Sequence, residues 1–380
     1  MTTPGTEARV RGDRIADLRS RRGALLSLYV ARPSPGGFAA LLSDLVKPIR
    51  ERSSDFDRDV RMSVRADAER IHDLADRLEL DSAPGYAVFA SSLDDIFELD
   101  PLDQPPLDVA SLGPRPYMRP LRAMPRPTRS AILVADRAMA RTFVAIEGVV
   151  EEIDQGIRAD IGNRSWGGFS GYEEHTVRSR AQEVSARLWR EAGERLLGHH
   201  IERPFDYLAI GAQEELVEEI ARTLHPYLAR LPRETFQASP HGIQLSNLRV
   251  EIAAMDGEMR RRRHTALAGR VCDTAWGGGN AVLGLNDVIT SANAQAIDTL
   301  VVAGRFERPG SLCDNCGYLA RGGSTCPVCG SDLFSIDDVV AAVMEAVVAA
   351  SGSISQLSVP SPLDREGIGA LTRFPVPARP

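Results

Sequence analysis

The stretch TLVVAGRFERPGSLCDNCGYLARGGSTCPVCG, residues 299–330, decides the fold of the last third of the chain. Its first four residues, Thr299 to Val302, are apolar or β-branched, which predicts a strand. The stretch lies between two segments with helical patterning, Asp287 to Ala296 and Ile336 to Ala350. Strand and helix therefore alternate around an excursion that contains four cysteines, and this order predicts a compact α/β domain.

The cysteines of this excursion follow the pattern Cys313-x2-Cys316-x9-Cys326-x2-Cys329. Two short Cys-x2-Cys turns bring four thiolates to one point, and zinc takes four sulfur ligands in a tetrahedron. The pattern predicts Zn²⁺ as a structural cofactor, because a metal with four cysteine ligands keeps no open position for catalysis. Two disulfides or four unliganded thiols are the alternatives, and a cytosolic setting disfavours them. The tight turns are allowed by four glycines: Gly317, Gly322, Gly323 and Gly330.

Upstream of this region, the patterning predicts two more α/β domains, so that the chain divides into residues 1–125, 126–268 and 269–380. In the first domain we expect strands at residues 25–30, 85–90 and 96–99, with helices at 38–50 and 60–78. In the second we expect a meander of three strands within residues 131–153, a strand at 207–211, and helices at 173–197, from 214 and at 245–267. The fifth cysteine, Cys272, is expected to be a small buried apolar residue rather than a nucleophile.

Composition excludes several classes of protein. A chain of 380 residues with 43% hydrophobic and 26% charged residues is typical of a soluble protein with several domains. No apolar run reaches membrane-spanning length, and the N-terminus has no signal-like pattern, so we expect a cytoplasmic protein with no membrane partner. Gly277-Gly278-Gly279 is not followed by a Gly-Lys-Ser/Thr motif, which disfavours nucleotide binding. No motif indicates an enzyme.

The formal net charge of −7 argues against unspecific adhesion to nucleic acid, so any RNA contact has to come from local cationic strips. One strip lies in the proline-rich segment from Gly113 to Arg129, which is otherwise read as a solvated linker. Another strip, residues 260–263, lies near the C-terminal end of a predicted helix. The negative end of the helix dipole favours cations there and is enough to explain two of the four. The candidate rRNA contacts are Arg115, Arg119, Arg122, Arg126, Arg178, Arg180, Arg260, Arg261, Arg262 and Arg263.

A glycine-rich loop precedes the long helix of the middle domain. It comprises Trp166, Gly167, Gly168, Phe169 and Ser170. Adjacent glycines let a backbone approach another molecule closely, and the flanking aromatic rings could stack on bases. An ordinary flexible loop is the equally weighted alternative.

Together these features resemble the archaeal and eukaryotic class I release factor and Pelota family, and most of all its bacterial branch, the Balon-type ribosome hibernation factors. The resemblance rests on the Gly-Gly loop before a long helix, the four-cysteine excursion, and three segments of the last third: GNAVLGLNDV at 279–288, AIDTLVV at 296–302 and GIGALTRF at 367–374. It is strong over the C-terminal third, moderate over the middle domain and weak over the N-terminal domain.

The resemblance implies three domains in a tRNA-like arrangement that occupies the ribosomal A site, with the C-terminal domain carrying an inserted zinc ribbon. The partners would be the 70S ribosome, through 16S and 23S rRNA, and elongation factor Tu or another translational GTPase at the C-terminal domain. The Gly-Gly loop would face the peptidyl transferase centre. The loop that would face the decoding centre comprises Arg52, Ser53, Ser54, Asp55, Phe56, Asp57 and Arg58.

The chain departs from release factors at both loops. Gly167-Gly168-Phe169 stands where they carry Gly-Gly-Gln, and phenylalanine has no amide to place the attacking water. The segment 51–58 lacks their codon-reading Asn-Ile-Lys-Ser motif. We therefore expect a non-enzymatic hibernation factor that inhibits or protects idle ribosomes. The alternatives are a Pelota-like splitting or surveillance adaptor and a rescue factor that hydrolyses peptidyl-tRNA.

Overall fold

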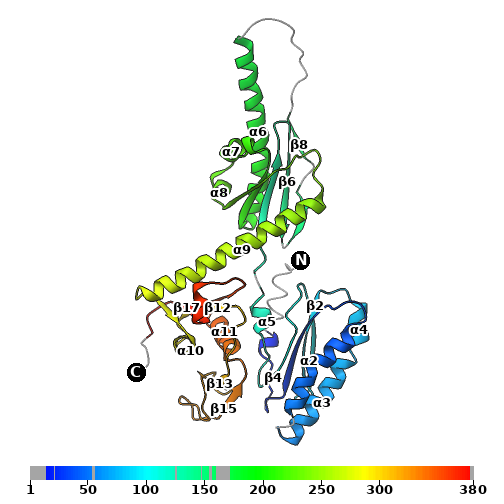
Figure 1. Ribbon diagram of the computed structural model, residues 1–380, viewed down its shortest axis with the longest axis vertical. Coiled ribbons are helices and arrows are strands. Elements are labelled where there is room, and N and C mark those ends of the chain that lie inside the picture. Colours follow the sequence, from blue (N-terminus) through cyan, green and yellow to red (C-terminus); the bar gives the residue numbers. More distant parts are fainter. Residues whose placement is uncertain are drawn as a thin grey trace. The chain divides into compact units, whose positions relative to one another are not determined.

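A computed structural model of the chain (Figure 1) describes residues 14–20, 22–53, 56–124, 126–146, 148–153, 156–159 and 172–376. The chain divides into two compact units, one made of residues 1–125 and 264–380 and the other of residues 126–263. The long helix α9, Leu245–Trp276, passes from the second unit into the first at residue 264. Each unit contains both sheets and helices, so the mixed α/β, multidomain class predicted from the sequence is confirmed.

The N-terminal part of the first unit is a four-stranded antiparallel sheet in the order β3-β2-β1-β4. Its strands are β1 Leu25–Ala31, β2 Gly85–Ser91, β3 Ile96–Leu102 and β4 Val109–Gly113. Side chains alternate across a strand, so Leu26 and Leu28 of β1 pack under the helices while Leu25 and Tyr29 enter a second core on the opposite face. Both faces are thus covered, which is why β2 is buried along its whole length.

Three helices cover the first face of this sheet: α2 Phe38–Arg52, α3 Arg58–His72 and α4 Ala75–Leu80. The sequence predicted a single helix over residues 60–78, and this was wrong. The apolar period continues through Ile71, Leu74 and Leu78, because both helices bury the same seam. The backbone nevertheless breaks after Asp73, the C-terminal cap of α3. The opposite face is covered by the short helix α5, Arg119–Arg122, and its neighbours Tyr117 and Met118.

The C-terminal part of the first unit has a second sheet, in the order β11-β17-β12-β16. Its strands are β11 Ala281–Leu283, β12 Ile297–Ala303, β16 Ser353–Leu357 and β17 Ile368–Thr372. Helices α10 Leu285–Asn293 and α11 Val339–Ala349 pack on one face. The end of α9 and the 3-10 helix η2, Pro362–Arg365, pack on the other. Cys272 is 1% exposed in this second core, which confirms its expected place among apolar side chains.

A small three-stranded sheet is inserted between β12 and α11. It has the order β14-β13-β15, with β13 Gly310–Cys313, β14 Leu319–Ala320 and β15 Leu333–Ile336. All its pairings are antiparallel. The four cysteines lie at the ends of these strands and in the turns between them, so the excursion predicted from the sequence is a ribbon of its own.

The second unit is built on a mixed sheet in the order β10-β9-β5-β6-β7, with β8 paired to β6. Its strands are β5 Arg129–Ala135, β6 Met139–Ile146, β7 Val149–Glu152, β8 Ile157–Arg158, β9 Tyr207–Gly211 and β10 Arg233–Phe236. Helices α6 Tyr172–Glu202, α7 Glu214–Thr223 and α8 Pro226–Ala229 belong to one face. The first turns of α9 cover the other through Leu248, Ile252 and Met259. The predicted meander is confirmed as β5, β6 and β7.

One buried carboxylate in this unit makes stability depend on pH. Asp256 of α9 is 5% exposed and accepts a hydrogen bond of 2.9 Å from the hydroxyl of Tyr207. Burial raises the pKa of Asp256, and this outweighs the opposite effects of Tyr207, Arg260 and Arg263. The folded state therefore favours the protonated form. The corresponding stabilisation is complete below the pKa of the unfolded chain and is lost as the pH rises through the pKa of the folded state.

We expect Asp256→Asn to remove this loss, because asparagine keeps an acceptor for Tyr207 and cannot ionise. The variant should therefore become more stable relative to the wild type as the pH rises from 4 to 7, which means that the difference in free energy of unfolding, variant minus wild type, increases. Urea unfolding of the full chain at several pH values measures this difference. Asp273→Asn, at an exposed position of the same helix, controls for the loss of a carboxylate. A difference that stays constant across the pH range would contradict the prediction.

Candidate metal centre and cationic cleft

The four ribbon cysteines converge on one point. Their sulfur atoms all lie within 4.8 Å of one another. Two cross pairs are closest, Cys313 with Cys329 and Cys316 with Cys326, each at 3.5 Å between Sγ atoms. A tetrahedral zinc with Zn–S bonds of about 2.3 Å requires sulfur separations of about 3.8 Å. Four sulfur donors at this spacing fit a metal ion of that kind.

The two Cys-x2-Cys turns are built in the same way. In the first, the N–H of Gly317 donates to the carbonyl of Cys313 at 2.8 Å, and in the second the N–H of Gly330 donates to that of Cys326 at 3.0 Å. Both glycines have a φ near +75° (76° and 75°), a conformation that other residues rarely adopt. The sequence predicted this need for glycine at both positions, and the prediction is confirmed.

Hydrogen bonds prepare one of the four thiols as a ligand. The hydroxyl and backbone N–H of Ser331, and after them the side chain of Asn315, lower the pKa of Cys329 to about 5. The deprotonated thiolate is the form that binds a metal ion. Cys313 and Cys326 are buried while Cys316 and Cys329 are exposed, so the cluster lies at the surface of the ribbon.

Asn293 attaches the ribbon to the C-terminal domain. This last residue of α10 donates from its side-chain amide to the carbonyl of Leu319 at 2.8 Å and accepts from the N–H of Leu319 at 2.9 Å. The amide thus pairs with β14 as a neighbouring strand would. Asn293 was not among the residues predicted from the sequence, because no local pattern singles it out.

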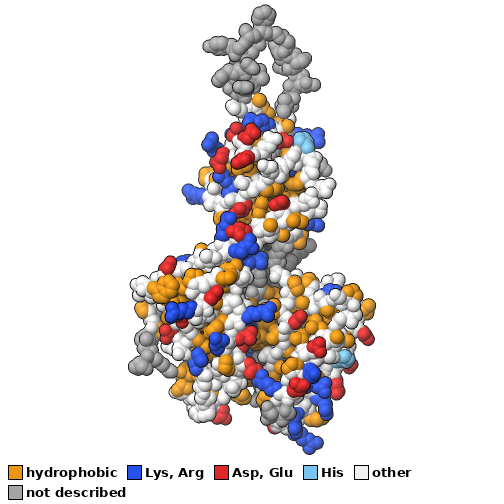
Figure 2. Space-filling model, viewed as in Figure 1, with side chains coloured by type: hydrophobic (Ala, Val, Ile, Leu, Met, Phe, Trp, Pro, Cys, Tyr) orange, Lys and Arg blue, Asp and Glu red, His pale blue; other side chains and the backbone are white. Residues whose placement is uncertain are grey.

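A cationic cleft of about 690 Å3 lies between α2 and α3 of the N-terminal domain. Five basic side chains line it, all exposed: Lys47, Arg50, Arg58, Arg61 and Arg65. Glu51, Ser53 and Met62 complete the lining. In the space-filling view, Lys and Arg side chains gather where α2 ends and α3 begins (Figure 2). Five cations around one concave surface create a positive potential that favours an anionic ligand.

The acidic residues beside Arg58 do not neutralise the cleft. Asp57 caps α3 by accepting from the N–H of Val60 at 2.9 Å, and Arg22 pairs with both Asp57 and Asp59, at 3.8 and 2.6 Å. Within the part of the chain that the structure describes, none of the five cleft cations has a carboxylate within 4.0 Å. Their charge therefore remains available to a partner.

The predicted decoding-centre loop borders this cleft. Arg58 and Ser53 line it, and Phe56 is 37% exposed. Arg52 instead pairs with Asp337 of the C-terminal part. Ser54 and Asp55 lie outside the described residues, as does the Gly-Gly loop from Trp166 to Ser170.

Most of the arginines predicted to contact rRNA have carboxylate partners within the chain. Arg115, Arg119 and Arg122 pair with Asp314, Asp338 and Glu345. For Arg119 this corrects the prediction, because a side chain that is 5% exposed cannot reach RNA in this conformation. The partners follow about two hundred residues later, so the sequence shows a bare cationic strip where the fold makes ion pairs.

The second cationic strip is also largely paired. Arg261 and Arg262 both contact Glu258, and Arg262 reaches Glu234 at 2.6 Å. Arg126 and Arg263 both contact Asp206, at 3.6 and 2.9 Å, and Asp206 also accepts from the N–H of Arg129. Arg260 has no ion pair among the described residues. The side chains of Arg178 and Arg180 lie outside the described part.

Four of the five cleft cations were not among the residues predicted from the sequence: Lys47, Arg50, Arg61 and Arg65. A signal was present, because Arg58, Arg61 and Arg65 recur at steps of three and four and so share one face of a helix. Lys47 and Arg50 have the same spacing on α2. The missing information was that the two faces meet in one cleft.

No protein-family model matches the sequence, and no curated protein matches it. Solved structures similar to the chain include an archaeal translation termination factor, aRF1, at 16% identity and a TM-score of 0.26, with 98% of this chain and 99% of that chain covered. Archaeoglobus fulgidus Pelota is similar at 16% identity and a TM-score of 0.36, with 77% of this chain and 80% of that chain covered. A model of ribosome-bound archaeal Pelota and ABCE1 is similar at 16% identity and a TM-score of 0.41, with 77% of this chain and 78% of that chain covered. At such values, function has to be inferred from this chain's own residues.

In the described residues, no helix has both the length and the apolar content needed to span a bilayer.

Proposed function

We propose that this protein is a ribosome-binding translation factor that occupies the A site of idle ribosomes. The observation that carries the proposal is the cationic cleft between α2 and α3, where five basic side chains without carboxylate partners among the described residues surround a concave surface. RNA phosphates are the anions that such a surface suits, and the contact would be sensitive to salt. With a net charge of −7 for the whole chain, contact with RNA would have to come from a local cationic surface such as this cleft.

The C-terminal sheet supports the family assignment behind this proposal. The third segment of the resemblance lies more than sixty residues after the first two, yet its strand β17 pairs with both β11 and β12 of those segments. The four-cysteine ribbon follows β12 directly. Motifs that form one sheet form one structural unit, which is what a shared domain requires.

We further propose that the protein is a hibernation factor: it inhibits or protects idle ribosomes and does not release peptide. Phe169 stands at the position of the release-factor glutamine, and its ring has no group that could place a water molecule at an ester. The proposed ion at the cysteine cluster is Zn²⁺ with a structural role. The proposed arrangement is tRNA-like, with elongation factor Tu or another translational GTPase at the C-terminal domain. A factor of this kind would act in the cytoplasm.

Sedimentation with ribosomes tests the binding step. Purified protein is pelleted with 70S ribosomes through sucrose at 50, 100 and 200 mM KCl, with and without A-site tRNA. We expect about one copy per ribosome at low salt, less at higher salt, and displacement by the tRNA. Protein that remains in the supernatant at 50 mM KCl would reject the proposal.

A second pair of measurements separates hibernation from the alternative. On ribosomes stalled with labelled peptidyl-tRNA, we expect no peptide release and no separation of subunits. Release of peptide would identify a hydrolase, and separation that depends on a GTPase would identify a Pelota-like splitting adaptor.

A further inference from the structure

The segment between Pro114 and Arg122 is the joint between the N-terminal and C-terminal parts of the first unit. Met118 and Leu121 pack into the core beneath the N-terminal sheet, and the N–H of Tyr117 donates to the hydroxyl of Ser27 at 3.0 Å. The arginines at steps of four and three, Arg115, Arg119 and Arg122, instead meet carboxylates of the C-terminal part. One side of the segment therefore packs on the N-terminal part, and the other side contacts the C-terminal part.

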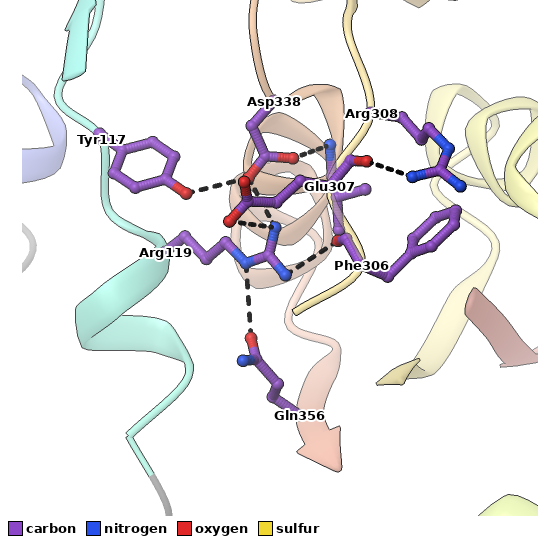
Figure 3. A network of polar contacts seen from close by, with 8 residues as sticks. Tyr117, Arg119, Phe306, Glu307, Arg308, Asp338 and Gln356 are labelled. Carbon is purple, nitrogen blue, oxygen red and sulfur yellow. Dashed lines mark hydrogen bonds and ion pairs between the residues drawn. The ribbon is translucent and has the colours of Figure 1, made fainter. Parts of the chain in front are cut away.

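Arg119 is the buried centre of this joint (Figure 3). Its guanidinium donates to Asp338 at 2.7 Å, to the carbonyl of Phe306 at 2.9 Å and to the amide oxygen of Gln356 at 3.4 Å. The side chains of Arg119 and Asp338 are 5% and 7% exposed. A buried ion pair of this kind fixes a geometry, because neither charge can be left without the other.

Asp338 has no unused acceptor atom in the network. One oxygen, Oδ1, accepts from the N–H of Val340 at 3.0 Å and so caps α11. The other, Oδ2, accepts from Arg119 and, at 3.0 Å, from the hydroxyl of Tyr117. Burial and the charge of Asp338 raise the pKa of Tyr117, which keeps this hydroxyl protonated as a donor. The joint is therefore anchored on the first turn of α11.

Arg115 connects the same joint to the cysteine cluster. It donates from Nε to the carboxylate of Asp314 at 3.0 Å and from Nη2 to the carbonyl oxygen of the same residue at 3.1 Å. Asp314 lies inside the first Cys-x2-Cys turn, directly after Cys313 and two residues before Cys316. Both groups that Arg115 grips are thus placed by the turn that would hold the metal.

We propose that metal binding by the four cysteines and docking of the two parts are coupled through the contact between Arg115 and Asp314. Without the metal, the turn is held only by its own hydrogen bonds, and the carbonyl and carboxylate of Asp314 lose their fixed positions. With the metal bound, the carbonyl and the carboxylate of Asp314 are held in positions where the guanidinium of Arg115 can donate to both. The inference rests on the metal site and does not depend on ribosome binding.

Coupling is reciprocal, and this makes it measurable from both ends. If the metal strengthens the docking, then the docking strengthens metal binding by the same factor. The ion pair between Arg119 and Asp338 would hold the two parts together with or without the metal. The contact of Arg115 with Asp314 would strengthen only when the metal is bound. Loss of metal would disorder the ribbon and loosen the N-terminal part from the C-terminal part, while the four-stranded sheet of each part stays folded.

The first test measures zinc affinity of the full chain by competition with a chromogenic chelator. We expect Arg115→Met to weaken zinc binding about fivefold. Arg321→Met is the matched control, because Arg321 is an exposed cation of the same ribbon with no ion pair among the described residues. In the double variant Arg115→Met with Asp314→Asn, the loss should be smaller than the product of the two single losses. Equal affinities for Arg115→Met and Arg321→Met would overturn the proposal.

The second test follows hydrogen exchange of residues 114–122 by mass spectrometry, before and after removal of the metal. In the wild type we expect removal to speed exchange in this segment. In Arg115→Met we expect faster exchange from the start and little further change. Exchange that is unaffected by metal removal in the wild type would overturn the coupling, whatever the outcome of the ribosome experiments.

Discussion

Cys326→Ser is expected to abolish tight metal binding and to unfold the ribbon from Gly310 to Ile336. A serine hydroxyl is a poor ligand for a metal that prefers thiolates, and the folding energy of a small ribbon of this kind comes largely from its metal. Apparent binding energies of structural zinc sites are about 10–16 kcal/mol, so the loss of one ligand is large on the scale of domain stability. The metal content of the purified protein, measured by mass spectrometry, should fall from about one ion per chain to nearly none.

Cys272→Ser is the matched control for this experiment. It removes a thiol that is equally buried but belongs to the core between α9 and the C-terminal sheet. We expect it to keep its metal and to lose stability through the polar group placed in an apolar core. A Cys326→Ser variant that retained a full complement of metal would show that the four cysteines do not form the site.

Replacing three cations of the cleft is expected to produce the second large effect. In the triple variant Arg58→Gln, Arg61→Gln, Arg65→Gln, up to three phosphate contacts are lost. Each contact releases about 0.9 of a counterion, so affinity for ribosomes should fall on the order of a hundredfold near 0.1 M salt. The slope of the logarithm of affinity against the logarithm of salt should become shallower by about two to three. Sedimentation across a salt series measures both quantities.

A second triple variant separates the cleft from net charge. Arg222→Gln, Arg230→Gln and Arg249→Gln remove the same three charges at exposed positions of the other unit, none with an ion pair in the described part of the chain. We expect this variant to bind ribosomes nearly as the wild type does. Equal losses in the two variants would mean that binding follows total charge, and the cleft would then have no special part in it.

The sequence was sufficient for those features that depend on local pattern. A short apolar run from Leu25 to Val30 predicted strand β1, and the spacing of the four cysteines predicted the cluster. The burial of Cys272 was predicted because a cysteine that stands apart from the cluster usually behaves as a small apolar residue. In each of these cases, the residues that determine the outcome lie within a few positions of one another, or within a single turn.

The features that the sequence could not give depend on contacts between distant segments. Arg119 looks like a solvated cation until Asp338 is placed beside it, and Asn293 looks like an ordinary helix end until β14 lies against it. The cleft could not be predicted because it forms only where the cationic faces of α2 and α3 meet in the folded chain. Charge along a chain therefore gave a misleading picture of charge on the surface, because the fold neutralised the strips that stood out and left exposed the ones that did not.

Asp206 makes the middle unit a self-closing insertion. The arginines that contact its carboxylate, Arg126 and Arg263, are the first and the last residue of that unit. The two ends of the insertion thus meet at a single side chain, and a segment whose ends meet can be gained or exchanged by recombination without stretching the chain around it. The middle unit thus has the closely spaced ends that an inserted domain requires, and the rest of the chain can close around it without being stretched.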